Sequence, residues 1–445
     1  MFKKFLVVFA FLVPVLVWWY LARLATEREE AVAAYRKLAA EHRAMVYQKS
    51  LATPKTHSTQ EGPPVAWDLL LREWHARATL DPAWMQFWDE LLGKQSEQIP
   101  KEDIERLGQF FDVNPDMATG VRRFAAQGWH GYTVDLSKGI AAELPHLANV
   151  RQYGRILRAQ AMLAAHRGNT EQALADALAI FSLAAMLRAE PMVISQLVRV
   201  AIIGIAVDAI EAVSAQTPLT AGQTHRVVDV LKSVDLHPGL TNAVLTEGEF
   251  YLQMMENVQV GELEQYKFLP LFPNDNLAYF HTTLFARPLL DSEARLITVY
   301  ARRIAAFHER PYFEVWDELK ALQAEIDHLP DLRVFTKAAL PSFMHAAEAQ
   351  ARAETQLDLA MLGLLIELFH NETGAYPESL AALPPMEEVT ARKDPFTGAP
   401  FKYMLEPQRM LLYSLGPNRT DDNGAHHLVE ADIVWRGTED AVVVH

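Results

Sequence analysis

The stretch that decides the fold is residues 151–187, RQYGRILRAQAMLAAHRGNTEQALADALAIFSLAAML. Apolar residues recur every three or four positions before and after Arg167-Gly168-Asn169, which indicates an amphipathic helix on each side. Gly168 suits the left-handed residue that ends a helix, and Asn169 or Thr170 suits the N-cap that begins the next one. We therefore predict a helical hairpin made of residues 151–166 and 170–187.

This hairpin resembles a single tetratricopeptide-type unit. It has small residues at Ala159 and Ala164, the turn glycine, and Ala173 five positions after that glycine. The second helix extends to about Pro191, which is longer than that repeat allows, and the chain shows no period of about 34 residues. A helical pair is predicted, and a repeat array is not.

Helical patterns continue on both sides of the hairpin and predict an all-α body over residues 67–341. Residues 192–213 are very apolar, but Arg199 and Asp208 leave too short an uncharged run to cross a bilayer. We interpret this segment as a buried central helix. The other predicted helices are residues 67–77, 82–92, 223–233, 241–258, 291–308 and 311–328. Trp67, Trp74, Trp84 and Trp88 could stack on sugars, although aromatic residues at helical spacing are more typical of a core.

The composition is that of a globular protein with an acidic surface. The chain has 445 residues, half of them hydrophobic, with a formal net charge of −15 and no cysteine. Binding to nucleic acid depends on neutralising phosphates, so the acidic balance argues against a nucleic-acid partner. The lack of cysteine excludes disulfides, thiolate catalysis and cysteine-rich zinc sites.

Residues 5–22 form an uncharged apolar run, close to the roughly 20 residues that cross a bilayer. Lys3 and Lys4 precede the run, which keeps the N-terminus cytoplasmic, and the aromatic residues Trp18, Trp19 and Tyr20 follow at the far interface. A cleaved signal peptide is the alternative, but the sequence after these rings makes a poor cleavage site. We predict a cytoplasmic tip and transmembrane anchor over residues 1–25, in a bacterial inner membrane, with the bulk of the chain periplasmic.

A charged helix is expected to follow the anchor over residues 26–52. Its apolar face comprises Ala31, Tyr35, Leu38, His42 and Met45. Fewer than three heptads are covered, so packing on the protein's own body is favoured over dimerisation, and the oligomeric state stays open. Residues 53–66 are rich in Pro, Thr and Ser and are predicted to be a linker.

The body carries no catalytic motif that the sequence can identify. Glu247 and Glu249 are two positions apart, so they point to different helix faces, and the same holds for Glu262 and Glu264. The histidines lack metal-ligand spacing, and Arg302, Arg303, His308 and Glu309 could line a cleft but equally suit a helix surface. The sequence favours a non-enzymatic role. A hydrolase stays the alternative, because its two catalytic carboxylates can come from loops that are distant in the sequence.

The C-terminal residues 342–445 change character and predict a small α+β domain. A long helix is expected from Ser342, after Pro341, to about Glu372, with Gly374 ending it. A short helix over residues 378–383 follows. Period-2 patterns then predict strands over residues 401–405, 410–414 and 432–435, and a fourth over 441–444.

The order of the predicted elements and the sequence motifs within them resemble the periplasmic part of the major pseudopilin of type II secretion systems, over about residues 346–440. The matching segments are Gly374-Ala375-Tyr376-Pro377 with Leu380 and Leu383, Lys393-Asp394-Pro395-Phe396 with Gly398, Pro400 and Tyr403, Leu412-Tyr413-Ser414-Leu415-Gly416, Asp421-Asp422, and Asp432-Ile433-Val434-Trp435. The resemblance implies a pseudopilin-like fold and protein partners among secretion-system components.

The resemblance also implies a structural calcium ion in the loop before the last strands. The matching ligands are the Leu415 carbonyl and the side chains of Asn418, Asp421 and Asp422. Ca²⁺ prefers six to eight hard oxygens, which such a loop can supply. The alternative is a plain solvated turn, since Asp-Asp-Asn-Gly is good turn chemistry.

The chain also departs from the pseudopilin pattern. No prepilin-type cleavage site or early Glu occurs in the apolar run, and the helical body separates that run from the C-terminal region. Assembly into a pseudopilus does not transfer with the fold. We expect a mainly α, membrane-anchored extracytoplasmic protein for protein–protein interaction or scaffolding, associated with a type II secretion or pilus-like system. The alternative is a periplasmic hydrolase or carbohydrate-binding protein with a cleft in the body.

Overall fold

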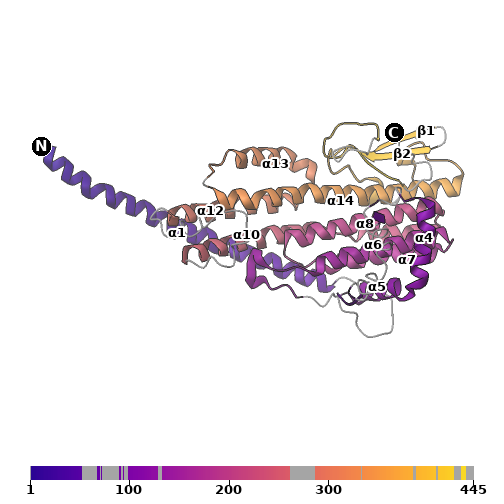
Figure 1. Ribbon diagram of the computed structural model, residues 1–445. Helices are drawn as coiled ribbons and strands as arrows, with labels where there is room; N and C mark the ends of the chain where they lie inside the picture. The colour runs from indigo at the N-terminus through magenta and orange to yellow at the C-terminus, as the bar shows by residue number, and fades with distance from the viewer. Residues whose placement is uncertain are drawn as a thin grey trace.

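The structure is a computed structural model of an elongated, mainly helical protein with a small antiparallel sheet (Figure 1). It describes residues 2–52, 99–128, 133–260, 286–331, 333–383, 387–406, 409–424 and 432–436, together with residues 68–70, 72, 90, 91 and 94. The predicted linker, the four tryptophans from Trp67 to Trp88 and the fourth predicted strand lie outside these residues.

The helical hairpin is present. Its helices are α6 (His146–His166) and α7 (Thr170–Met186), so the first helix begins five residues earlier than predicted. Gly168 has a φ of 76°, and the side chain of Asn169 caps α7 by accepting from the backbone N–H of Gln172 at 3.2 Å. The turn residues therefore act as the sequence indicates.

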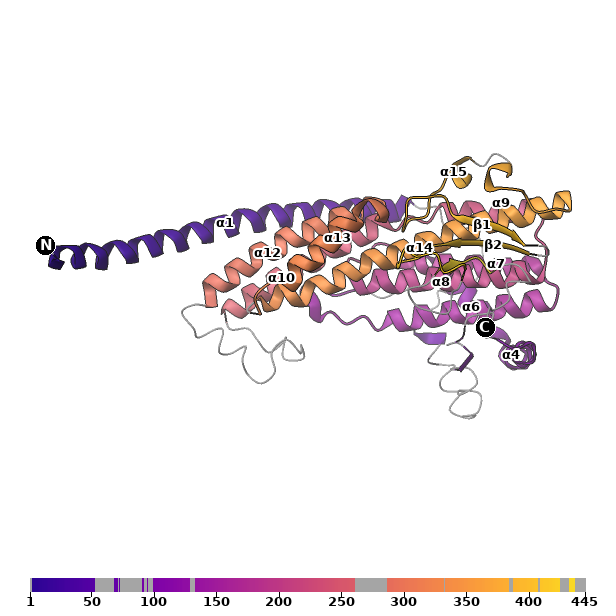
Figure 2. The ribbon, with the colours of Figure 1, turned by 90° about the horizontal axis from the view of Figure 1, so that it is seen from above.

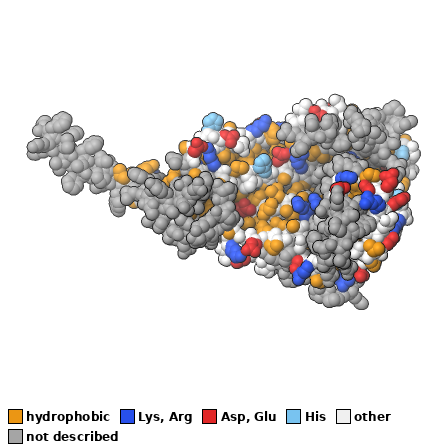
Figure 3. All heavy atoms as spheres, viewed as in Figure 1, with side chains coloured by type: hydrophobic (Ala, Val, Ile, Leu, Met, Phe, Trp, Pro, Cys, Tyr) orange, Lys and Arg blue, Asp and Glu red, His pale blue; other side chains and the backbone are white. Residues whose placement is uncertain are grey.

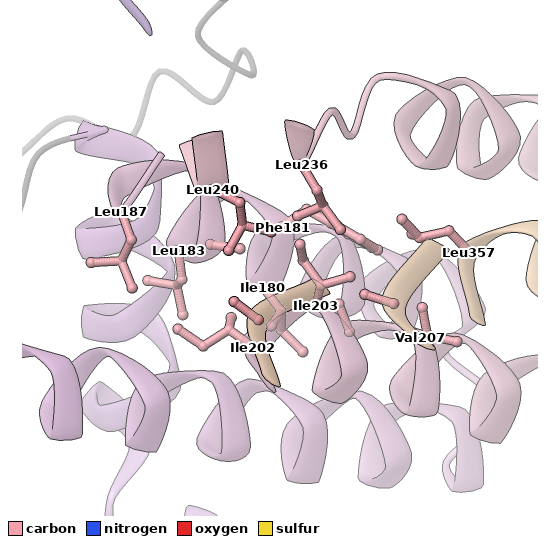
Figure 4. Packing of buried hydrophobic residues seen from close by; sticks show 14 of the residues in the cluster. Ile180, Phe181, Leu183, Leu187, Ile202, Ile203, Val207, Leu236, Leu240 and Leu357 are labelled. Atoms are coloured by element: carbon pink, nitrogen blue, oxygen red, sulfur yellow. The ribbon is translucent and has the colours of Figure 1, made fainter. Parts of the chain in front are cut away.

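The apolar segment after the hairpin is α8 (Val193–Gln216), and it lies in the core. Figure 4 shows Ile202, Ile203 and Val207 of α8 packed among side chains of α7, α10 and α14. Within the described part of the chain, α8 is the one helix long and apolar enough to cross a membrane, yet 61% of its most apolar window is buried inside the protein. Its charged residues are paired: Arg158 donates to Asp208 at 3.0 Å, and Arg199 donates to the Asp235 carbonyl at 2.8 Å.

The N-terminal helix α1 (Phe2–Ala52) is continuous over 51 residues. Its second half packs on α10 (His237–Val260) and α12 (Ala286–Phe307), and its first half projects beyond the body (Figures 1 and 2). The buried face consists of Val32, Tyr35, Ala39 and Val46. The predicted face was wrong at Met45, which is 43% exposed, because the true stripe is turned by about one residue.

The long helix α14 (Val334–Thr373) joins both ends of the body, because it packs on α8 and α9 as well as on α10, α12 and α13. The prediction that it begins at Ser342 was wrong. Pro341 lies inside the helix, whose first turns bury Phe335, Leu340 and Phe343 against the body. Burial of these side chains outweighs the hydrogen bond that proline removes. The domain boundary predicted between residues 341 and 342 thus falls within a core helix.

The C-terminal sheet has the order β1-β2-β3 and is antiparallel throughout. Its strands are β1 (Lys402–Glu406), β2 (Arg409–Ser414) and β3 (Ile433–Val434), close to the three predicted ones. We call residues 374–436 the cap. The short helix predicted before the sheet is the 3-10 turn η4 (Leu380–Ala382), followed by α15 (Glu387–Thr390).

The cap is fastened to the body through Trp435 and Arg436. A Cβ on Gly363 of α14 would lie 2.5 Å from Nε1 of Trp435, so the indole occupies a notch that only glycine leaves open. The indole N–H donates to Glu367 at 3.0 Å, and Arg436 pairs with Glu211 of α8 at 2.9 Å. The remaining helices are α4 (Lys101–Val113), α5 (Pro115–Gln127), the 3-10 helix η2 (Leu136–Ala141), α9 (Ala221–Lys232) and α13 (Tyr312–Asp327).

Candidate functional sites

The predicted calcium loop, residues 415–424, leaves β2 at a point fixed by Asp394. This aspartate is 2% exposed and accepts hydrogen bonds from the hydroxyl of Ser414 at 2.8 Å and the backbone N–H of Leu415 at 3.3 Å. It also accepts from the backbone N–H of Phe396 at 2.9 Å. Asp394 therefore ties the start of the loop to the turn that precedes the sheet.

Three of the predicted ligands contact one another or their neighbours. The Asn418 amide donates to Asp422 at 2.9 Å, while the Asn418 side-chain oxygen accepts from the backbone N–H of Thr420 at 2.9 Å. Asp421 accepts from the Tyr413 hydroxyl at 2.9 Å and pairs with Lys402 at 3.1 Å. In this arrangement, donors of the protein itself satisfy much of the oxygen set.

Asp432 is a fourth acidic residue at the loop, and sequence reasoning missed this role because it assigned the residue to a strand. It is 3% exposed, and its Oδ2 accepts from the backbone N–H groups of Asp422 at 3.1 Å and Gly424 at 2.7 Å. Its Oδ1 is buried without a hydrogen-bond partner. Burial, together with the like charges of Asp422 and Asp421, raises the pKa of Asp432 to about 6.

These residues fit a hard cation in chemistry. A buried carboxylate oxygen without a donor is costly, and a divalent ion would offset both that cost and the repulsion among the three carboxylates. Nevertheless, no preformed group of three or more acidic or histidine ligands occurs among the described residues. Cation binding would therefore require two contacts to break. These are the ion pair of Lys402 with Asp421 and the hydrogen bond from the Asn418 amide to Asp422.

A second candidate site lies where α12, α13 and α14 meet, and we call it the histidine cavity. Its walls include His308, Tyr312, Gln350 and Glu354, and its volume of about 10 Å³ suits one water-sized group. Nε2 of His237 lies 3.1 Å from Glu354. No ligand-type spacing in the sequence connects the two histidines, which come from the start of α10 and the end of α12.

The hydrogen bonds define the protonation of His308. The Gln350 amide N–H donates to Glu354 at 2.8 Å, which turns the amide oxygen toward Nδ1 of His308 at 2.7 Å. Nδ1 therefore carries the hydrogen, and Nε2 is a bare acceptor, buried without a partner. Burial lowers the pKa of His308 to about 4, so the ring stays neutral.

Glu354 has a carboxylate neighbour one helical turn along α14. Asp358 is 5% exposed and pairs with Arg392 of the cap. Burial raises the pKa of Asp358 to about 6, and burial likewise raises the pKa of Glu354. Glu354 lines the cavity and Asp358 lies one helical turn away, and neighbouring carboxylates with raised pKa values are a pattern found in acid–base sites.

The other charged residues considered in the sequence are dispersed. The guanidinium of Arg302 lies 5.9 Å from the centre of the Tyr35 ring, and Arg303 pairs with Glu325 at 2.8 Å. Glu247 accepts from the backbone N–H of Val193 at 2.7 Å, whereas Glu249 pairs with Arg43. Of the proposed cleft residues, only His308 lines the cavity.

Comparison of the chain with protein-family models, with curated proteins and with solved structures found no match. The class defined by the fold is a mainly helical protein with a small three-stranded antiparallel sheet. The functional interpretation therefore rests on the sites and surfaces of this chain.

Proposed function

We propose that this protein is a membrane-anchored, extracytoplasmic scaffold that presents its cap to protein partners of a type II secretion or pilus-like machine. One observation carries the proposal: α1 is a single helix whose second half is locked into the body and whose first half leaves it (Figures 1 and 2). On the outer half, Val17, Trp19 and Tyr20 are 49%, 55% and 57% exposed, as expected of side chains that meet lipid and its interface.

The lock between α1 and the body is specific. The Tyr35 hydroxyl donates to the Leu245 carbonyl at 2.7 Å, and Arg28 and Arg36 both pair with Glu256. Outside these contacts, Glu27 pairs with Arg295. Only about five residues, or roughly 8 Å of helix, separate that pair from the end of the uncharged apolar run at Ala22. The anchor would therefore set the body close to the membrane surface and fix its direction.

The other end of the molecule supports a presentation role. The cap lies at the end of the body away from the N-terminus, where α14 ends (Figure 1). The edge strand β1 exposes Met404 (40%) and Leu405 (46%).

Ile194 of α8 is 48% exposed, and Figure 3 shows hydrophobic side chains gathered at the middle of the body between charged ones. Exposed apolar surface of this kind marks protein contacts.

Site-specific photo-cross-linking of the full-length protein in membranes tests this function. The photoreactive residue replaces Leu405 of β1 or Ile194 of α8, and Glu318 on the charged outer face of α13 serves as the control position. We expect covalent capture of a secretion ATPase, platform or pseudopilin component from the first two positions only. Recovery of the protein alone, or equal capture from all three positions, would refute the scaffold.

The anchor has its own test. Membrane fractionation should place the full-length chain with the inner membrane, and deletion of residues 1–25 should release it. Protease added outside the inner membrane should degrade the body. A full-length chain that remains soluble, or a body that only detergent exposes to protease, would contradict the proposed location.

A second candidate function, a hydrolase, is favoured by the histidine cavity. Nε2 of His237 lies 3.1 Å from Glu354, which lines a space for one water, and Asp358 provides another carboxylate with a raised pKa. The test is a screen of glycan and ester substrates with the wild type and with Glu354→Gln, which keeps the hydrogen bond to His237 but removes the charge. Turnover that falls at least 100-fold in the variant would support the hydrolase. Turnover that survives the substitution would exclude this site.

A further inference from the structure

The calcium loop is joined to the body at Arg419. This residue lies between the predicted ligands Asn418 and Asp421 and has a φ of 57°, the left-handed region that non-glycine residues rarely adopt. Its backbone N–H donates to the Gly416 carbonyl at 3.1 Å, which closes a tight turn. The turn directs the guanidinium over the ring of Trp316 in α13, with 5.2 Å between the carbon of the guanidinium and the ring centre.

The contact continues from Trp316 to the histidine cavity. The rings of Trp316 and Tyr312 lie 5.7 Å apart, and Tyr312 forms a wall of the cavity. Tyr312 also meets Phe396 of the cap edge to face at 5.4 Å. The first two turns of α13 therefore lie between the loop and the cavity and contact both.

We propose that cation binding by residues 415–424 and Asp432 is coupled to α13 through the contact of Arg419 with Trp316. This inference rests on the candidate cation site described above and extends it into the body. The buried, unpartnered Oδ1 of Asp432 supports the site, since it is an acceptor without a donor directly beside the loop. An ion there draws Asp421 and Asp422 inward, and Arg419 is held between those residues and Asn418, so its side chain moves with them.

The coupling acts in both directions, because linkage between two equilibria is reciprocal. The contact of Arg419 with Trp316 holds the loop in place before an ion binds. This reduces the conformational entropy that the loop loses on binding. Loss of the contact should therefore weaken cation binding. A cation–π contact of this exposure corresponds to a change of about 2- to 5-fold in the dissociation constant.

The test uses the full-length protein with Ca²⁺ alone as the probe. Isothermal calorimetry gives the dissociation constant, and tryptophan fluorescence is titrated in parallel for the wild type and for Trp316→Phe. The difference between the two fluorescence curves isolates Trp316 from the eight other tryptophans. We expect a saturable difference signal with the calorimetric midpoint, and binding about 2- to 5-fold weaker in Arg419→Gln. The control variant Arg310→Gln removes a cation that pairs with Glu318 of α13 rather than with the loop, and it should bind Ca²⁺ like the wild type.

The failures are distinguishable. Calorimetric binding with no Trp316 signal, or with unchanged affinity in Arg419→Gln, overturns the coupling and leaves the cation site in place. Absence of calorimetric binding in the wild type overturns the cation site and the coupling together. Binding that survives Asp432→Asn and Asp421→Ala/Asp422→Ala places the ion elsewhere and overturns both as well.

Discussion

Replacement of Gly363 by alanine tests how the cap is held on the body. Gly363 lies in the middle of α14, where alanine would ordinarily stabilise a helix by about 1 kcal/mol. Here, however, a Cβ would lie 2.5 Å from Nε1 of Trp435, which is well inside van der Waals contact with a rigid ring. The ring has to move, and with it the hydrogen bond to Glu367 and the Arg436–Glu211 pair.

The expected magnitude follows from the size of the displaced ring. Overpacking a core typically costs about 1–3 kcal/mol, and complete loss of a buried tryptophan costs roughly 3–5 kcal/mol. Trp435 is 2% exposed and packs against α14. After subtraction of the helix propensity gained by alanine, we expect Gly363→Ala to lower the free energy of unfolding by about 1–3 kcal/mol.

Urea denaturation followed by far-UV circular dichroism measures the effect. The matched control is Gly204→Ala, a mid-helix glycine of α8 whose added Cβ would have its nearest atom at 3.6 Å, an ordinary contact. This control should be neutral or stabilising. In a Trp435→Leu background, Gly363→Ala should cease to destabilise, as a double-mutant cycle would show. Two results would refute the close packing of Trp435 against Gly363. One is a Gly363→Ala protein as stable as the Gly204→Ala control, and the other is an equal loss of stability from Gly363→Ala in the wild-type and Trp435→Leu backgrounds.

Three further outcomes are expected. Burial raises the pKa of Glu367 from its ordinary value of 4.5 to about 8. Its contribution to stability is therefore complete below about 4.5 and is lost as pH rises from there to about 8. Glu367→Gln should flatten the decline in melting temperature between about pH 5 and 8, and an unchanged decline would contradict the assignment. Burial lowers the pKa of His308 to about 4, so its contribution to stability is present above about 6.5 and is lost as pH falls toward 4. His308→Gln should lose less melting temperature over that range than the wild type, and an equal loss would argue against a neutral ring. Tyr35→Phe removes the hydrogen bond to the Leu245 carbonyl and should lower the free energy of unfolding by about 1 kcal/mol, as measured by urea denaturation. Gly248→Ala places a methyl group against the Tyr35 side chain and should lower it by more. The reverse order would be evidence against this packing.

Local signals in the sequence predicted the helical hairpin and the three strands well, whereas α4 and α5 were not predicted. The turn at Gly168-Asn169 and the period-2 pattern around Leu412 each depend on a few adjacent residues, so a single sequence suffices to interpret them. The start of α14 was missed because Pro341 is a local signal against a helix, and the burial of Phe335 and Phe343 that overrides it depends on distant partners. Tertiary packing decided that boundary.

The sites were harder to predict for the same reason. Asp432 is part of a strand pattern in the sequence, and only the folded loop brings it beneath Asp422 and Gly424. The histidine cavity combines residues from three helices, and no spacing along the chain connects His237 with Glu354. The membrane anchor remains a prediction, since most of the side chains of residues 5–22 lie outside the described structure. The relation to pseudopilins likewise remains a prediction.

The wide separation in sequence between packing partners has a consequence for biogenesis. Arg28 of α1 meets Glu256, 228 positions later, and α8 is covered by α14, which the ribosome makes more than a hundred residues after it. If the body is exported as proposed, α8, with a mean hydropathy of 2.0, would emerge before α14 is made to cover it. The translocation channel could release such a segment sideways into lipid. We expect Arg199 and Asp208 to oppose that release, so that uncharged residues at both positions would divert nascent chains into the membrane before the core can form.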